Sequence, residues 1–191
     1  MKKLALDDVR PPKIYERARD EARRRVIELK RARRVALGPS VTLVFENRAT
    51  MTFQIEEMLR AEHIETPAKM QEEIDVYNSL LPEPGGLAAT LFVEIEEEKE
   101  IRSTLNRLVG IDEHVTLDVG GVVVKAKFEA GRSEEERISS VQYVRFDLSP
   151  EAARALATPS TPVALVTDQP GYEFRVELPE ASRASLAEDL L

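Results

Sequence analysis

The spacing of apolar residues changes along this chain, and that change constrains the fold more than any other feature. Between Pro11-Pro12 and Gly38-Pro39, apolar residues recur every three or four positions, which predicts one helix of about 24 residues. The period then becomes two over residues 41–46, which predicts a strand. Helical spacing returns over residues 50–81 with a break at Thr66-Pro67, so we expect a helical hairpin in which Thr66 caps the second helix.

Strand-like spacing dominates the rest of the chain. A second strand is expected at residues 87–95, followed by a helix that passes through residues 101–108 and ends at Gly110. Further expected elements are a hairpin of 115–119 and 122–128 around Gly120-Gly121, a long strand at 138–148, a short helix at 151–157 capped by Ser149, a hairpin of 163–167 and 172–178, and a terminal helix at 182–190. The predicted class is α+β, with a long N-terminal helix and a helical hairpin packed on a mainly antiparallel sheet.

A chain of 191 residues is long enough for one domain with its own core. We expect a single domain over residues 1–191 that contains three segments. Residues 1–38 form a basic helical segment, residues 39–111 mix strand and helical hairpin, and residues 112–191 are mainly antiparallel strands.

Cysteine is absent and only two histidines are present, which limits the chemistry of this chain. Disulfides, cysteine-ligated zinc, an intrinsic iron–sulfur cluster and a thiol nucleophile are all excluded. No apolar run has the length of a signal peptide or of a membrane span, so we expect a cytoplasmic protein that does not contact the membrane.

Charge is distributed unevenly along the sequence. Residues 10–34 contain eleven Lys or Arg and four Asp or Glu, a net charge of +7, while residues 35–191 carry −15. One interpretation is a basic helix that lies on an acidic body; the other is a docking surface for an acidic partner or nucleic acid. Nucleic acid is the less favoured partner, because the acidic body would repel phosphates.

The charged segment, residues 44–64, contains the candidate site residues that matter most. Glu46 ends the first predicted strand and Glu57 lies on the following helix, while Glu73 and Glu94 come from the hairpin partner and the end of the second strand. If these four carboxylates converge, their hard oxygen atoms would favour a divalent metal such as magnesium, manganese or calcium. The favoured alternative is an ion-pair network with nearby arginines, in which Glu56 and Arg60 can also pair along the helix. Burial of Glu57 among arginines would favour scaffolding, and burial among other carboxylates would favour a metal.

Anion binding is a second possible role for the charged segment. Arg48, Gln54 and Arg60 could hold a carboxylate or a phosphate near the helix start, where backbone N–H groups point outward. Internal pairing of the two arginines is again the favoured interpretation.

Several sequence blocks together resemble a known family. They are Phe45-Glu46-Asn47-Arg48, Phe53-Gln54-Ile55, the run from Glu57 to Glu62, Tyr77-Asn78-Ser79-Leu80-Leu81-Pro82, residues 89–95 and residues 141–146. On these blocks the chain resembles an uncharacterised bacterial family catalogued as domain of unknown function 3501. The resemblance implies no established activity. It implies an association with redox and iron–sulfur proteins, and hence a redox or oxidative-stress setting.

The sequence therefore favours a cytoplasmic binding or accessory protein of unknown biochemical function. The first alternative is a carboxylate-based enzyme that depends on a divalent metal. The second is a docking protein that uses the basic N-terminal helix.

Overall fold

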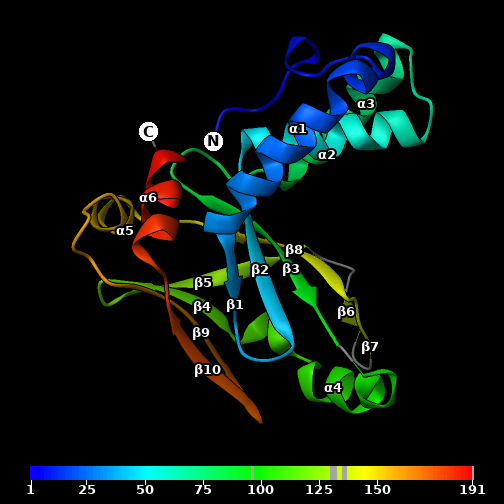
Figure 1. The fold of residues 1–191 in the computed structure, drawn as a ribbon. Coiled ribbons are helices and arrows are strands. Elements are labelled where there is room, and N and C mark those ends of the chain that lie inside the picture. Colours follow the sequence, from blue (N-terminus) through cyan, green and yellow to red (C-terminus); the bar gives the residue numbers. More distant parts are fainter. Residues whose placement is uncertain (96, 130–132, 135–136, 191) are drawn as a thin grey trace.

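The fold is a mixed α+β arrangement in which three helices gather at one end of a curved antiparallel sheet (Figure 1). It is seen in a computed structural model that describes residues 1–95, 97–129, 133–134 and 137–190. The helices are α1 (Pro12–Arg33), α2 (Arg48–Ala61), α3 (Pro67–Leu80), α4 (Ile101–Leu108), α5 (Pro150–Leu156) and α6 (Glu180–Glu188), with short 3-10 turns η1 (Leu6–Asp8), η2 (Glu98–Glu100) and η3 (Ile111–Glu113). The strands are β1 (Arg34–Ala36), β2 (Val41–Glu46), β3 (Leu87–Val93), β4 (Val115–Val119), β5 (Val122–Phe128), β6 (Ser133–Glu134), β7 (Arg137–Ile138), β8 (Val141–Phe146), β9 (Val163–Gln169) and β10 (Tyr172–Glu177).

Eight strands form the main sheet in the order β1-β2-β3-β8-β5-β4-β9-β10, and all neighbours are antiparallel. The sheet curls until its two edge strands meet. The Tyr172 hydroxyl on β10 donates a hydrogen bond to the Leu37 carbonyl (2.8 Å) and accepts one from the Ser40 N–H (2.9 Å), both in the turn between β1 and β2. The Phe174 ring lies so close to Gly38 that a Cβ there would come within 2.6 Å of it. Glycine at position 38, with φ +81°, therefore permits the sheet to close.

The main core lies inside this nearly closed sheet. Inward positions alternate along each strand, and Leu43, Leu91, Leu117 and Leu165 are fully buried. All six residues of β2 are buried, because helices cover the outer face of this strand. A second core lies in the helical layer, where Leu4 and Val9 pack with apolar residues of α2 and α3.

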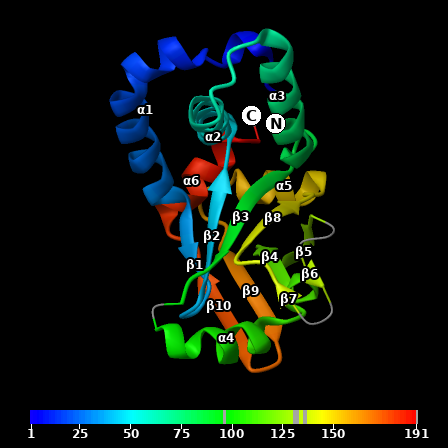
Figure 2. The ribbon, with the colours of Figure 1, turned by 90° about the vertical axis from the view of Figure 1, so that its right-hand side faces the viewer.

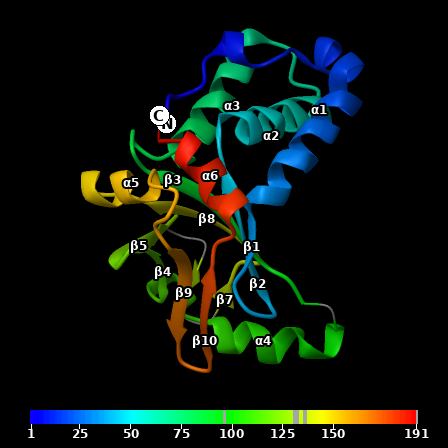
Figure 3. The ribbon, with the colours of Figure 1, turned by 60° about the vertical axis from the view of Figure 1, so that its left-hand side comes forward.

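The helices occupy different places around the sheet. Helices α1, α2 and α3 form a helical layer at the end where β2 leaves the sheet, while α4 lies at the opposite end (Figure 2). Helix α6 contacts both α1 and α5, so the last helix joins the helical layer to the sheet (Figure 3). Among the described residues, no helix combines the length and the apolar character needed to cross a membrane.

Most predicted elements are present, and the main differences concern the end of the N-terminal helix and the strand expected at 138–148. Both predicted hairpins form, with two-residue turns at Gly120-Gly121 and Pro170-Gly171. The N-terminal helix ends at Arg33 rather than near Gly38, because residues 34–36 pair with β2 and bury Val35 in the main core. The expected strand at 138–148 is divided at Ser139-Ser140 into β7 and β8. Thr66 occupies the N-cap position of α3, but its side chain makes no capping hydrogen bond.

Candidate functional site

A reciprocal cap at Asn47 sets the geometry of the charged segment. The Asn47 side chain accepts a hydrogen bond from the Thr50 N–H (3.1 Å), and the Thr50 hydroxyl accepts one from the Asn47 N–H (2.8 Å). This cap starts α2 immediately after β2. Glu46 is thereby held at the end of the strand, Glu57 faces α1, and Glu56 faces Arg10 just before that helix.

Glu56 is a buried carboxylate that the N-terminal segment neutralises. It is 1% exposed. Arg10 binds it through both arms of the guanidinium, with Nε and Nη2 each at 2.7 Å, and the Arg10 N–H donates a further bond of 2.9 Å. The predicted pairing of Glu56 with Arg60 was therefore wrong. The true partner is 46 residues away in the sequence, and no local pattern indicates it.

Glu57 is held by three donors in the described structure. Arg19 binds it through Nε (2.8 Å) and Nη2 (3.0 Å), and the Tyr15 hydroxyl donates at 2.6 Å. Arg60 lies 3.5 Å away. The hydrogen bonds from Arg19 are the main reason that the pKa of Glu57 falls to about 2, although partial burial acts in the opposite direction. Burial, with the bond to Glu57, raises the pKa of Tyr15.

The other predicted metal ligands have different surroundings. Glu94 accepts a hydrogen bond of 2.7 Å from the Thr42 hydroxyl and pairs with Arg34 on β1, and these contacts lower its pKa. Glu73 is half-buried on α3. Among the described residues, no group of three or more His, Asp or Glu side chains lies close enough to hold a metal directly. Glu57 and Glu94 are therefore engaged by cations, and the four-glutamate metal site stays a prediction.

Glu46 differs from Glu56 and Glu57 because one of its carboxylate oxygens has no hydrogen-bond partner among the described residues. Its side chain is 2% exposed. Oε1 accepts a hydrogen bond of 2.9 Å from the Thr90 hydroxyl and lies 3.6 Å from the Lys30 ammonium. Oε2 is buried without a hydrogen-bond partner within the described part of the chain. A buried carboxylate oxygen left in this state costs about 1–3 kcal/mol or more.

The two arginines of the predicted anion site are already engaged within the molecule. Arg48 donates to the carbonyls of Lys2 and Lys3 (2.6 Å each) and pairs with Asp8 at 2.9 Å. Arg60 lies between Glu57 and Glu16. The third residue, Gln54, is half-buried on α2. The anion site also stays a prediction, and its guanidinium groups have protein partners.

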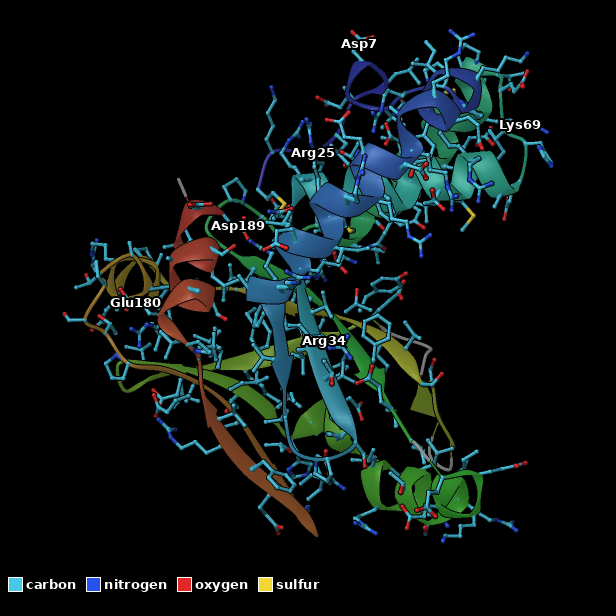
Figure 4. All side chains as sticks on the ribbon, in the orientation of Figure 1. Asp7, Arg25, Arg34, Lys69, Glu180 and Asp189 are labelled. Atoms are coloured by element: carbon cyan, nitrogen blue, oxygen red, sulfur yellow. The ribbon has the colours of Figure 1, made fainter. Side chains whose placement is uncertain are left out.

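The basic charge of the N-terminal segment is largely directed at the rest of the protein. Six of its cations reach acids outside residues 10–34, in the pairs Arg10–Glu56, Lys13–Glu65, Arg19–Glu57, Lys30–Glu46, Arg33–Asp189 and Arg34–Glu94. Figure 4 labels Arg34 and Asp189, which lie where α1 meets the sheet and α6. The structure thus has a basic helix on an acidic body. The sequence did not indicate Arg10, Tyr15 and Arg19 as partners, since each lies 38 or more residues from its acid.

A nearly closed antiparallel sheet with a helical layer at one end defines a class of mixed α+β proteins. The family model described as "Protein of unknown function (DUF3501)" matches residues 3–190. The chain belongs to this family, as its sequence blocks predicted. A crystal structure of a novel protein of unknown function from Burkholderia pseudomallei K96243 is similar over 100% of both chains, with a TM-score of 0.91 and 33% sequence identity. None of the curated proteins matches this chain.

Proposed function

We propose that this protein is a binding or accessory protein whose helical layer is a structural support rather than a reactive centre. The observation that carries the proposal is the pairing of Glu56 and Glu57 with Arg10 and Arg19. A bidentate arginine engages both oxygen atoms of a carboxylate, which disfavours that carboxylate as a general base or a metal ligand. The partner proposed is a redox or iron–sulfur protein, as the family resemblance implies, and the proposed setting is cytoplasmic, as the composition indicates.

The structural part of this proposal is tested by exchanging one ion pair. Arg19→Glu alone should lower the free energy of unfolding, because it places two acids side by side. Adding Glu57→Arg should restore much of the loss by re-forming the pair in reverse. If the double variant loses as much free energy of unfolding as the two single variants lose together, the two residues do not stabilise the fold as a pair, and the proposal is contradicted.

The binding role is tested by titrating the labelled full chain with redox and iron–sulfur proteins of its own cell. Saturable binding by the native chain is the expected result. Lys69→Glu, an exposed change on α3 away from the ion pairs, serves as a folded comparison variant. Turnover of a small molecule by the chain alone, without saturable binding to any of these proteins, would contradict the proposal.

The first alternative is a metal-dependent enzyme that uses Glu46, Glu57, Glu73 and Glu94. The open oxygen of Glu46 supports it, while the arginines on Glu57 and Glu94 weigh against it. Such a site should retain stoichiometric divalent metal when the protein is purified without chelator. Elemental analysis that finds no metal, with no thermal shift on adding manganese, iron or magnesium, would reject it.

The second alternative is docking through the outer face of α1. Arg17, Arg23 and Arg24 are exposed there and make no ion pair with any residue that the structure describes. A nucleic-acid ligand would show salt-dependent binding that is lost when Arg23, Arg24 and Arg25 are neutralised. Undetectable or salt-independent binding would reject that form of docking.

A further inference from the structure

Three acids near Tyr77 make no ion pair with an arginine among the described residues, unlike Glu56 and Glu57. Glu46, at the end of β2, has only the long contact with Lys30, and neither Glu62 nor Glu73 makes an ion pair within the described residues. Glu62 caps the C-terminal end of α2, and Glu73 lies on α3. We call these three acids, together with Tyr77 and Tyr143, the Tyr77 cluster.

The backbone brings Glu46, Glu73, Tyr77 and Tyr143 to one region between α3 and the sheet. Glu73 and Tyr77 are four residues apart and share a face of α3. Helix α3 packs against β8, as Figure 2 shows. Tyr143 on β8 is the register partner of Thr90 on β3, so both project from the same outer face of the sheet. Thr90 in turn holds Glu46 by the 2.9 Å hydrogen bond.

The electrostatic surroundings of Tyr77 support this placement. Its side chain is 9% exposed, and burial is the largest reason that its pKa rises to about 12. The nearby Tyr143 and the negative charges of Glu73, Glu62 and Glu46 raise the pKa further. The region is therefore negative, and the only cation that contacts its buried acid is Lys30 among the described residues.

We propose that the Tyr77 cluster binds one exchangeable divalent cation of the magnesium type, with Glu46 Oε2 as its direct protein ligand and Glu73 acting through metal-bound water. The unmet, buried Oε2 is the atom that such a cation would satisfy. Magnesium fits this arrangement because it keeps several waters and binds through one or two carboxylates. That mode does not need three direct ligands, which the described residues do not bring together. Lys30 balances Glu46 without the metal and moves away when the metal binds.

The experiment uses the full chain after chelator treatment and Mn²⁺ as the probe, with free Mn²⁺ followed by electron paramagnetic resonance. One Mn²⁺ should bind per chain, and excess Mg²⁺ should displace it. Glu46→Gln, which keeps an acceptor for Thr90, should weaken binding by about tenfold or more. Glu73→Gln should weaken it less. Glu72→Gln is the matched control, since Glu72 is exposed and adjacent to Glu73 on the same helix.

Lys30→Gln gives the most specific outcome, because removing the competing ammonium should tighten Mn²⁺ binding. A merely structural Lys30–Glu46 contact would lower stability without tightening it. Equal affinity of Glu46→Gln and Glu72→Gln would overturn the proposal, as would no binding at about 1 mM Mn²⁺, the weak end of natural sites. If Glu46→Gln fails to fold, Lys30→Gln and Glu73→Gln decide the question. This site is independent of the proposed binding role, and its loss would leave that role intact.

Discussion

At the scale of single residues, neighbouring glutamates in one helix have different surroundings. Glu56 is fully enclosed and held by Arg10, whereas Glu57 is a quarter exposed and shared by Arg19, Arg60 and Tyr15. Ten residues earlier, Glu46 is as deeply buried as Glu56 but has only a threonine hydroxyl and a distant ammonium. The number and type of hydrogen-bond donors around a glutamate, and not its burial alone, therefore distinguish a structural acid from a candidate ligand.

Glu57→Gln should lower the free energy of unfolding by about 1–3 kcal/mol at neutral pH. The folded pKa of Glu57, about 2, lies below its ordinary value of 4.5. Its contribution is therefore present above pH 4.5 and is lost as the pH falls toward 2. Urea unfolding at several pH values measures this. Glu16→Gln, an exposed change next to Arg60, is the control, and a constant difference between native and Glu57→Gln over this range would argue against the ion pair as the cause.

At the scale of elements, the ends of the helices determine where the charged groups lie. Asn47 starts α2 with a reciprocal cap, so β2 passes into the helix without a loop. The C-terminal end of α1 passes directly into β1, and Arg33 at this junction is 1% exposed. Arg33 donates to the Phe45 carbonyl (2.8 Å) and to Ser185 (3.0 Å), and it also pairs with Asp189. One arginine thus connects α1, β2 and α6.

Asn47→Ala should cost about 1 kcal/mol, the usual value of an N-cap side chain. Thr66→Ala changes the N-cap position of α3, where no capping bond exists, and should cost much less. Thermal or chemical unfolding of the two variants compares them directly. Equal losses would show that the Asn47 cap does not stabilise α2.

Arg33→Met should cost about 3–5 kcal/mol, because it leaves the buried Asp189 without its cation. Burial already raises the pKa of Asp189 above its ordinary value, so the folded state binds this proton more tightly than the unfolded state. The contribution of that carboxyl to stability is therefore largest at low pH and is lost as the pH rises through the folded pKa. Arg24→Met, an exposed change on the same helix, should stay within about 0.5 kcal/mol. Similar losses for both variants would contradict this role of Arg33.

At the scale of the whole molecule, two contacts far apart in sequence complete the fold. Tyr172 and Phe174 on β10 reach the turn between β1 and β2 and close the sheet. The six ion pairs between the N-terminal segment and later acids attach α1 to the acidic body. The charge asymmetry of the chain is thus largely resolved within the molecule.

Gly38→Ala should destabilise the protein more than Gly121→Ala, although both glycines have positive φ. A Cβ at Gly38 would meet the Phe174 ring, while a Cβ at Gly121 would have nothing within 4 Å. The backbone penalty of about 1–2 kcal/mol is common to both, so the difference reports the contact between the sheet edges. Adding Phe174→Ala to Gly38→Ala should recover part of the difference. If the two glycine variants have equal stability, the contact between Gly38 and the Phe174 ring does not contribute to the stability of the protein.

The sequence by itself determined the local elements, the hairpin turns, the α+β class and the family, because periodicity, glycine turns and sequence blocks depend on residues close together in the chain. It also indicated the charged segment and favoured arginine pairing over a metal for Glu57. Only the tertiary structure decided that α1 stops at Arg33, since pairing with β2 outweighs helical spacing there. Tertiary structure also decided that Arg10 and Arg19 bind Glu56 and Glu57, while Glu46 keeps an open oxygen. The physical reason is that a charge is neutralised by whatever lies within a few ångströms, and the fold brings together charges that are far apart in sequence: Arg19 lies 38 residues from Glu57, and Arg33 lies 156 residues from Asp189.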